Sequence, residues 1–110
     1  MKRGDIVSVA APGDYGNPRP AVIIQADALT QGGLGSIMLC LMTTHLVEAP
    51  TFRIPVPSND STGLNSPSRI MVDKVLTVPL DRVGSVIGRL DDEILLRLNR
   101  TLAFVVGLGQ

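Results

Sequence analysis

The sequence is poor in the residues that mark several common classes of small protein. It has one cysteine among 110 residues, so a disulfide within the chain is excluded. It has no tryptophan, one tyrosine and two phenylalanines, too few rings for the broad base-stacking platform of common RNA-binding modules. Ten basic residues balance ten acidic ones, so no overall positive field favours sequence-independent binding to nucleic acid. An anionic ligand therefore requires a local cationic patch.

The chain also starts without a long apolar run. Residues 1–5 are mostly polar or charged and lead directly into a strand-like pattern, whereas a signal peptide or a membrane span needs an apolar stretch. We therefore expect a cytoplasmic protein. The single cysteine, Cys40, lies in the apolar run Ile37–Met42, which predicts a buried small hydrophobe rather than a reactive thiol.

What the chain does contain is apolar surface in excess of its size. Hydrophobic residues make up 45% of the sequence, charged residues only 18%, and the mean hydropathy is +0.29. A chain of this length is the size of one ordinary domain, so we expect residues 1–110 to fold as a single domain. A monomer would struggle to cover so much apolar surface, which predicts a homodimer.

Short β-type segments dominate the first nine-tenths of the chain. They are rich in β-branched residues or continuously apolar, and Pro55 places one of them at a sheet edge. Six or seven short strands predict a mainly β fold, a small β-barrel rather than a sandwich. The predicted strands are Asp5–Ala10, Ala21–Gln25, Ser36–Met42, Thr51–Val56, Arg69–Asp73, Lys74–Val78 and Gly84–Ile87.

Turn-forming residues separate these strands, and the period changes near the end of the chain. Gln31–Gly35 is expected to be a flexible connector, and Pro57–Pro67 a long mobile loop that cannot support a packed element. From Asp91 onward apolar residues recur at steps of three and four, which predicts an amphipathic helix ending near Gly107. Asp91 is a suitable N-cap for this helix.

Arg19 stands at a loop-to-strand junction between two prolines. Pro20 biases Arg19 towards an extended backbone, and Pro18 fixes its own φ, so the guanidinium leaves the chain in a restricted direction. A guanidinium is always charged and offers parallel donors to a phosphate. The sequence therefore favours a phosphate site here, although the prolines can equally do no more than start an edge strand that Arg19 ends in solvent.

Four segments in order resemble the MazF/PemK-type toxins of type II toxin-antitoxin systems. They are Lys2–Val7, Gly16–Ile24, the strand end Met42-Thr43-Thr44, and Val72–Val78 with the terminal helix, so the resemblance covers nearly the whole chain. It implies an SH3-like small β-barrel with a C-terminal amphipathic helix, and a dimer that cleaves single-stranded RNA at short sequences. Such cleavage does not require a metal, because RNA can be cut by activating its own 2′-hydroxyl against the adjacent phosphate. It also implies a cognate antitoxin as partner, and it implies no cofactor.

The resemblance assigns roles to particular residues. Arg19 would stabilise the charge that develops on a scissile phosphate, and Thr43 would hydrogen-bond a phosphate oxygen. Asp73 matches an acidic position in part of the family and could accept the proton of the RNA 2′-hydroxyl, or could simply pair with Arg69 or Lys74. Further substrate contacts are expected from the preceding loop and from neighbouring strand ends, namely Tyr15, Gly16, Asn17, Pro18, Thr44 and Arg69.

The chain departs from the family pattern at the proton-transfer positions. Relatives often carry histidine or glutamate in the first loop, where this chain has Asp14 and Tyr15, and some carry arginine at the position of Met71. The identity of the base and the acid therefore stays open, and His45 is a further proton carrier to consider.

Two alternatives of other classes remain. One is a gyrase poison like CcdB, which Gly84–Gly88 and Val106–Leu108 resemble faintly, although such chains lack the Arg19-Pro20 motif. The other is a non-catalytic barrel that binds a partner peptide beside Tyr15 and the 57–67 loop.

Overall fold

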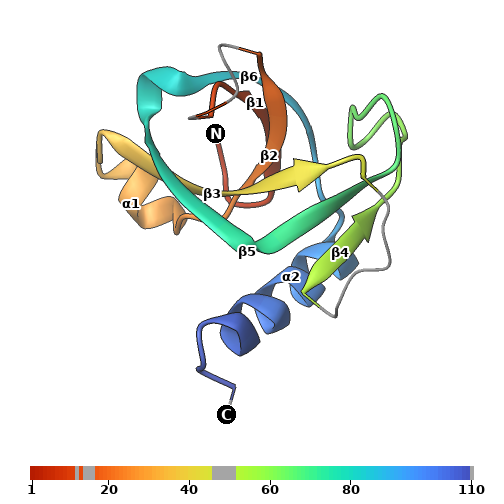
Figure 1. Cartoon of the computed structure of the whole chain (residues 1–110). Helices are drawn as coiled ribbons and strands as arrows, with labels where there is room; N and C mark the ends of the chain where they lie inside the picture. Colours follow the sequence, from red (N-terminus) through yellow and green to blue (C-terminus); the bar gives the residue numbers. More distant parts are fainter. Residues whose placement is uncertain (12, 14–16, 46–51, 110) are drawn as a thin grey trace.

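Six antiparallel strands form one strongly curved sheet with a helix packed across it (Figure 1). The computed structural model describes residues 1–11, 13, 17–45 and 52–109. The strand order is β4-β5-β3-β2-β1-β6. The elements are β1 (Asp5–Val9), β2 (Arg19–Ile23), α1 (Asp27–Gln31), β3 (Ser36–Thr43), β4 (Arg53–Val56), β5 (Ser68–Pro79), the 3-10 turn η1 (Leu80–Arg82), β6 (Val83–Arg89) and α2 (Asp92–Val105).

The sheet curls as a small barrel does but does not close. Its edge strands, β4 and β6, are each paired on one side only within the described part of the chain. β4 lies at an edge, as Pro55 predicts. Proline has no backbone N–H to donate, so it fits an edge strand, where one side needs no partner. The predicted β-barrel with a C-terminal helix is thus confirmed in its strand content and curvature.

Alternate residues of the strands enter two separate apolar clusters, one on each face of the sheet. On β1, Ile6 belongs to the cluster covered by α2, while Val7 and Val9 belong to the cluster inside the curl. Figure 1 shows α2 running across the convex side beneath β5 and β4. Its buried anchor is Leu98, which is fully inaccessible to solvent.

The helix begins as its cap residue predicts. The carboxylate of Asp91 accepts a hydrogen bond from the backbone N–H of Ile94 at 2.8 Å, which satisfies one of the unpaired amides of the first turn. The N-terminal segment is attached to the same helix, since Arg3 donates to the side chain of Asn99 and, through Nε, to the backbone oxygen of Ile24. Arg3 therefore has a structural role here.

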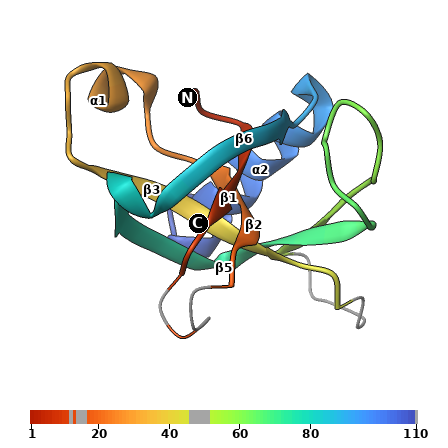
Figure 2. The ribbon, with the colours of Figure 1, turned by 90° about the horizontal axis from the view of Figure 1, so that it is seen from above.

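Two sequence predictions about local structure are wrong, and the structure adds one short helix that the sequence pattern does not predict. The segments 69–73 and 74–78 form one strand, β5, which crosses the sheet and contains an irregularity opposite Cys40–Met42. A short helix, α1, precedes the expected connector at 31–35. The 57–67 loop is packed rather than free, because Thr62 and Leu64 are buried in it (3% and 7% exposed). Figure 2 shows this loop and α1 at opposite ends of the molecule.

Candidate active site

The register of the strands gathers Arg19, Thr43 and Arg69 on one face of the sheet. Thr43 on β3 is directly opposite Arg69 on β5, so their side chains project to the same side. Arg19 is two residues before Ala21, which is paired with Leu41, itself two residues before Thr43. The three side chains therefore leave the ends of three adjacent strands on the side of the inner cluster, to which Ala21 and Leu41 belong.

Arg19 is held by the neighbouring strand. Its Nη2 donates a hydrogen bond to the backbone oxygen of Met42 at 2.9 Å, and the residue is half-buried. The alternative in which Arg19 ends its strand unattached in solvent is therefore wrong. The contact brings the guanidinium to the residue that precedes Thr43. A guanidinium has five N–H donors, so a single arginine can bind several acceptors at once.

The hydroxyl of Thr43 is engaged as an acceptor by the chain itself. Its Oγ1 accepts a hydrogen bond from the backbone N–H of His45 at 3.1 Å. A hydroxyl has one proton to donate and two lone pairs. Since one lone pair is engaged by the chain itself, the O–H remains available to a phosphate oxygen. His45 is exposed and contributes its backbone rather than its imidazole to this contact.

Two more charged residues occupy the same face. Arg53 on β4 is directly opposite Met71 on β5, and Nε of Arg53 lies 3.3 Å from Oδ1 of Asp73. Asp73 pairs more weakly with Lys74, at 4.0 Å, and its side chain is 28% exposed. We call Arg19, Thr43, Arg53, Arg69 and Asp73 the arginine face. It combines three guanidinium groups with one carboxylate, so its formal charge is positive.

Sequence reasoning missed Arg53. It paired Asp73 with Arg69 or Lys74, which are close to it in the sequence. The pairing of Asp73 with Arg53 depends on the register between β4 and β5, which the sequence does not reveal. Arg69 has a separate property: its Nε is buried and makes no hydrogen bond among the described residues. A buried donor without an acceptor is costly, and an anionic oxygen bound at this face would satisfy it.

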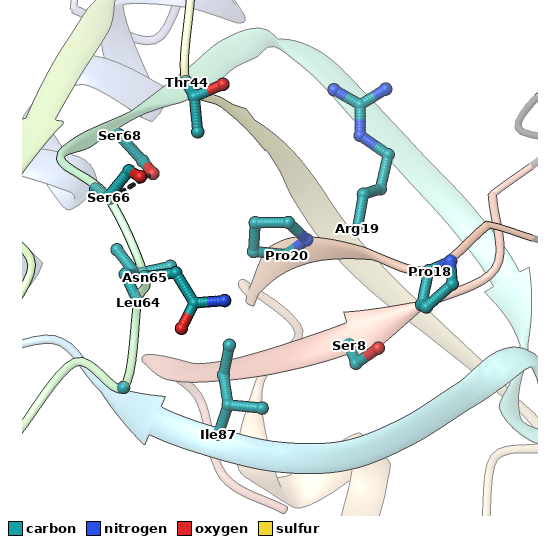
Figure 3. Close-up of a pocket in the computed structure, with 11 residues that line it drawn as sticks. Ser8, Pro18, Arg19, Pro20, Thr44, Leu64, Asn65, Ser66, Ser68 and Ile87 are labelled. Carbon is teal, nitrogen blue, oxygen red and sulfur yellow. Dashed lines mark hydrogen bonds between the residues drawn. The ribbon is translucent and has the colours of Figure 1, made fainter.

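A cleft of about 370 Å³ opens beside the arginine face (Figure 3). The predicted contacts Pro18 and Thr44 line it, together with Arg19, while Asn17 is exposed just before them. Figure 3 shows the Arg19 side chain pointing away from the other lining side chains. The predicted contacts Tyr15 and Gly16 lie outside the described residues. The remaining lining residues are Ser8, Pro20, Gly63, Leu64, Asn65, Ser66, Ser68 and Ile87.

The described residues contain no group of three or more histidine, cysteine, aspartate or glutamate side chains that could hold a metal ion. Cys40 is fully buried, and burial, with a smaller contribution from the negative charge of Asp73, raises the pKa of its thiol to about 12. The thiol is therefore protonated at neutral pH and plays no part in the arginine face.

Comparison with known proteins identifies the family. Residues 2–106 match the family described as the PemK-like, MazF-like toxin of type II toxin-antitoxin systems. The chain is 38% identical, over 99% of both chains, to the probable endoribonuclease MazF of Mycolicibacterium smegmatis. This chain therefore belongs to the MazF/PemK toxin family, and the sequence-based recognition of that family is confirmed.

Solved structures support the same fold. An endoribonuclease from a mycobacterial species, in complex with its cognate antitoxin, superposes with a TM-score of 0.81 at 18% identity, covering 98% of this chain and 96% of the other. The Mycobacterium tuberculosis toxin MazF-mt6 gives a TM-score of 0.79 at 21% identity over 94% and 96% of the two chains. At such identities these structures are evidence for the fold alone. Among the described residues, no helix is both long and apolar enough to cross a membrane.

Proposed function

We propose that this protein is the toxin of a toxin-antitoxin pair and an endoribonuclease that cleaves single-stranded RNA at selected sequences, arresting growth. Family membership and the 38% identical relative named as a probable endoribonuclease support the activity. The observation that carries the assignment to particular residues is the contact between Arg19 and the backbone of Met42. It holds a permanent cation at the residue that precedes Thr43, and we propose that a phosphodiester binds to this cation and to the Thr43 hydroxyl.

The chemistry needs only the RNA and side chains. The 2′-hydroxyl of one nucleotide attacks the adjacent phosphorus, its proton passes to a base, and the 5′-oxygen of the next nucleotide leaves and takes up a proton. The products are a 2′,3′-cyclic phosphate and a free 5′-hydroxyl. Negative charge builds on the non-bridging oxygens during the attack, and donors placed beforehand at those oxygens lower the barrier. Arg19 and Thr43 are the proposed donors.

The remaining residues of the arginine face have distinct proposed roles. Arg69 binds a neighbouring phosphate oxygen, since its buried Nε has no other acceptor among the described residues. Asp73 is the proposed proton acceptor for the 2′-hydroxyl, and its ion pair with Arg53 keeps the carboxylate on this face. Tyr15, Gly16, Asn17, Pro18 and Thr44 are proposed to contact the nucleotides on either side of the cut.

The partners follow from the same surface. An antitoxin that silences the enzyme would cover the arginine face with an acidic segment and thereby displace RNA, because both ligands require the same cations. We also propose a homodimer acting in the cytoplasm, where messenger RNA is translated. Exposed apolar side chains on β6, on α2 and just after α2, namely Val86, Phe104 and Leu108, support an interface between copies.

The test is cleavage of single-stranded RNA by the purified protein in the presence of a chelator. We expect fragments ending in a 2′,3′-cyclic phosphate, and we expect Arg19→Ala to lose cleavage while remaining folded. Cleavage only after addition of a divalent cation would contradict the proposed chemistry. Trapped gyrase-DNA complexes in the absence of RNA cleavage would support a CcdB-like poison instead.

A further inference from the structure

The cleft beside Arg19 has the composition of a pocket for a neutral, flat group rather than for a phosphate. Its volume of about 370 Å³ lies within the range of small-molecule sites. Arg19 is the one charged residue among its described lining residues, and the guanidinium points out of it (Figure 3). Its apolar walls are two proline rings and two aliphatic side chains, namely Pro18, Pro20, Leu64 and Ile87.

One wall of the cleft is a loop locked onto strand β6. Gly63 and Gly88 allow the two backbones to touch: a Cβ on Gly63 would lie 1.8 Å from the carbonyl oxygen of Ile87, and a Cβ on Gly88 would lie 2.1 Å from that of Thr62. The backbone N–H of Arg89 donates to Ser61 across the same contact at 2.9 Å. The loop therefore presents its next residues, Asn65 and Ser66, from a fixed support.

Asn65 is the residue equipped to read a base edge. Its side chain is exposed, projects into the cleft in Figure 3 and makes no hydrogen bond among the described residues. The neighbouring hydroxyl of Ser68 is already engaged, since it donates to the backbone oxygen of Ser66 at 2.9 Å. An asparagine amide offers one donor group beside one acceptor, a pattern that matches adenine, which presents a ring-nitrogen acceptor beside its amino group.

Residues that line the cleft directly follow residues of the arginine face in the sequence. Pro20 follows Arg19 and Thr44 follows Thr43, and consecutive Cα atoms are about 3.8 Å apart. Because successive side chains of a strand point to opposite faces, one strand end can hold a phosphate on one side and the base of the adjoining nucleotide on the other. Unpaired RNA can splay out a base in this way, whereas a duplex cannot.

We infer that this cleft is a nucleobase pocket, which takes one unpaired base, adenine in preference, from a nucleotide next to the scissile bond and reads it with Asn65. The inference rests on the proposed ribonuclease function and extends it to sequence selectivity. Prolines and aliphatic side chains would sandwich the base in place of aromatic rings, which accords with the scarcity of aromatic residues in the chain.

The first experiment compares the cut sites of three proteins on a pool of randomised single-stranded RNA, mapped by sequencing the new 5′ ends. Asn65→Ala should keep cleaving but lose about 5- to 150-fold of its preference at one position next to the cut, the equivalent of one lost bidentate base contact. Gln31→Ala is the matched control: it also removes an exposed amide, at the end of α1 and far from the cleft, and should cut as the wild type does.

Two results would overturn the pocket. One is an unchanged cut-site preference in a folded Asn65→Ala protein; the other is an equal loss of cleavage at every sequence, which would indicate a general role. A second measurement is independent of activity: adenosine monophosphate titrated into labelled protein should shift the side-chain amide resonances of Asn65 more than uridine monophosphate does. If the wild type fails to cut RNA yet this shift is seen, the ribonuclease proposal fails while the base pocket stands; no shift overturns the pocket.

Discussion

Replacing Arg19 by lysine separates the charge of the guanidinium from its shape. In the structure Nη2 of Arg19 donates to the backbone oxygen of Met42 at 2.9 Å, and the five N–H donors of a guanidinium let one arginine bind several acceptors at once. Lysine has a single nitrogen, so it cannot hold the same carbonyl and present two parallel donors to the phosphate at once. Loss of one preorganised donor to a developing anion costs about 10²- to 10³-fold in kcat, or about 2.7–4 kcal/mol.

We therefore expect Arg19→Ala to lose about 10²- to 10³-fold in kcat and Arg19→Lys to remain close to the alanine variant. The assay is single-turnover cleavage of a short fluorogenic RNA at saturating enzyme, with Arg100→Lys, an exposed exchange on α2, as the matched control. Urea unfolding should show that both Arg19 variants remain folded and unfold in a single cooperative transition. A lysine variant that cuts at the wild-type rate would refute the argument from shape.

Three further outcomes follow from the structure. Gly88→Ala should strongly lower the thermal unfolding midpoint, because the added Cβ would overlap the carbonyl of Thr62. The control Gly35→Ala should leave the midpoint unchanged, since its Cβ would meet no atom within 4 Å. Equal shifts of the midpoint in the two variants would contradict the contact between the loop and β6. Asp73→Asn should lower kcat by about 10²- to 10⁴-fold in a folded protein, the usual value of a general base, and retained activity would limit Asp73 to pairing with Arg53. Cys40 should resist iodoacetamide at pH 8.5 until urea is added, because burial raises the pKa of its thiol to about 12. Rapid labelling of the native protein would show the thiol to be accessible. The raised pKa also means that the free energy of unfolding falls as pH rises above the ordinary pKa of a thiol, since the unfolded chain then loses a proton that the folded chain keeps.

The sequence was most informative where a periodic pattern coincided with a capping residue. The helix from Asp92 was predicted in this way, because Asp91 precedes a regular apolar stripe. The continuous strand β5 was not predicted, since Asp73 and Lys74 interrupt the apolar pattern at the irregularity in its pairing, where both are exposed. Pattern reasoning treats such an interruption as a boundary, while the backbone continues through it.

The site could be predicted only in part, for a related reason. Arg19 and Thr43 stand out in sequence through the prolines and through the family resemblance, and the structure brings their strand ends together. Arg53 and Asn65 carry no local signal, since their relevance comes from cross-strand register in one case and from a loop contact in the other. Likewise, the turn formers of the 57–67 loop predict mobility, because the strand β6 that Gly63 contacts is distant in sequence.

The acceptor that orients Arg19 is a main-chain oxygen, and every residue type carries one. Substitutions at position 42 can therefore accumulate within the limits of core packing without releasing the guanidinium, provided that β2 and β3 stay paired. The pairing of β2 with β3 therefore determines the orientation of the guanidinium. Any descendant sequence that keeps this pairing keeps the orientation, whatever base preference it acquires.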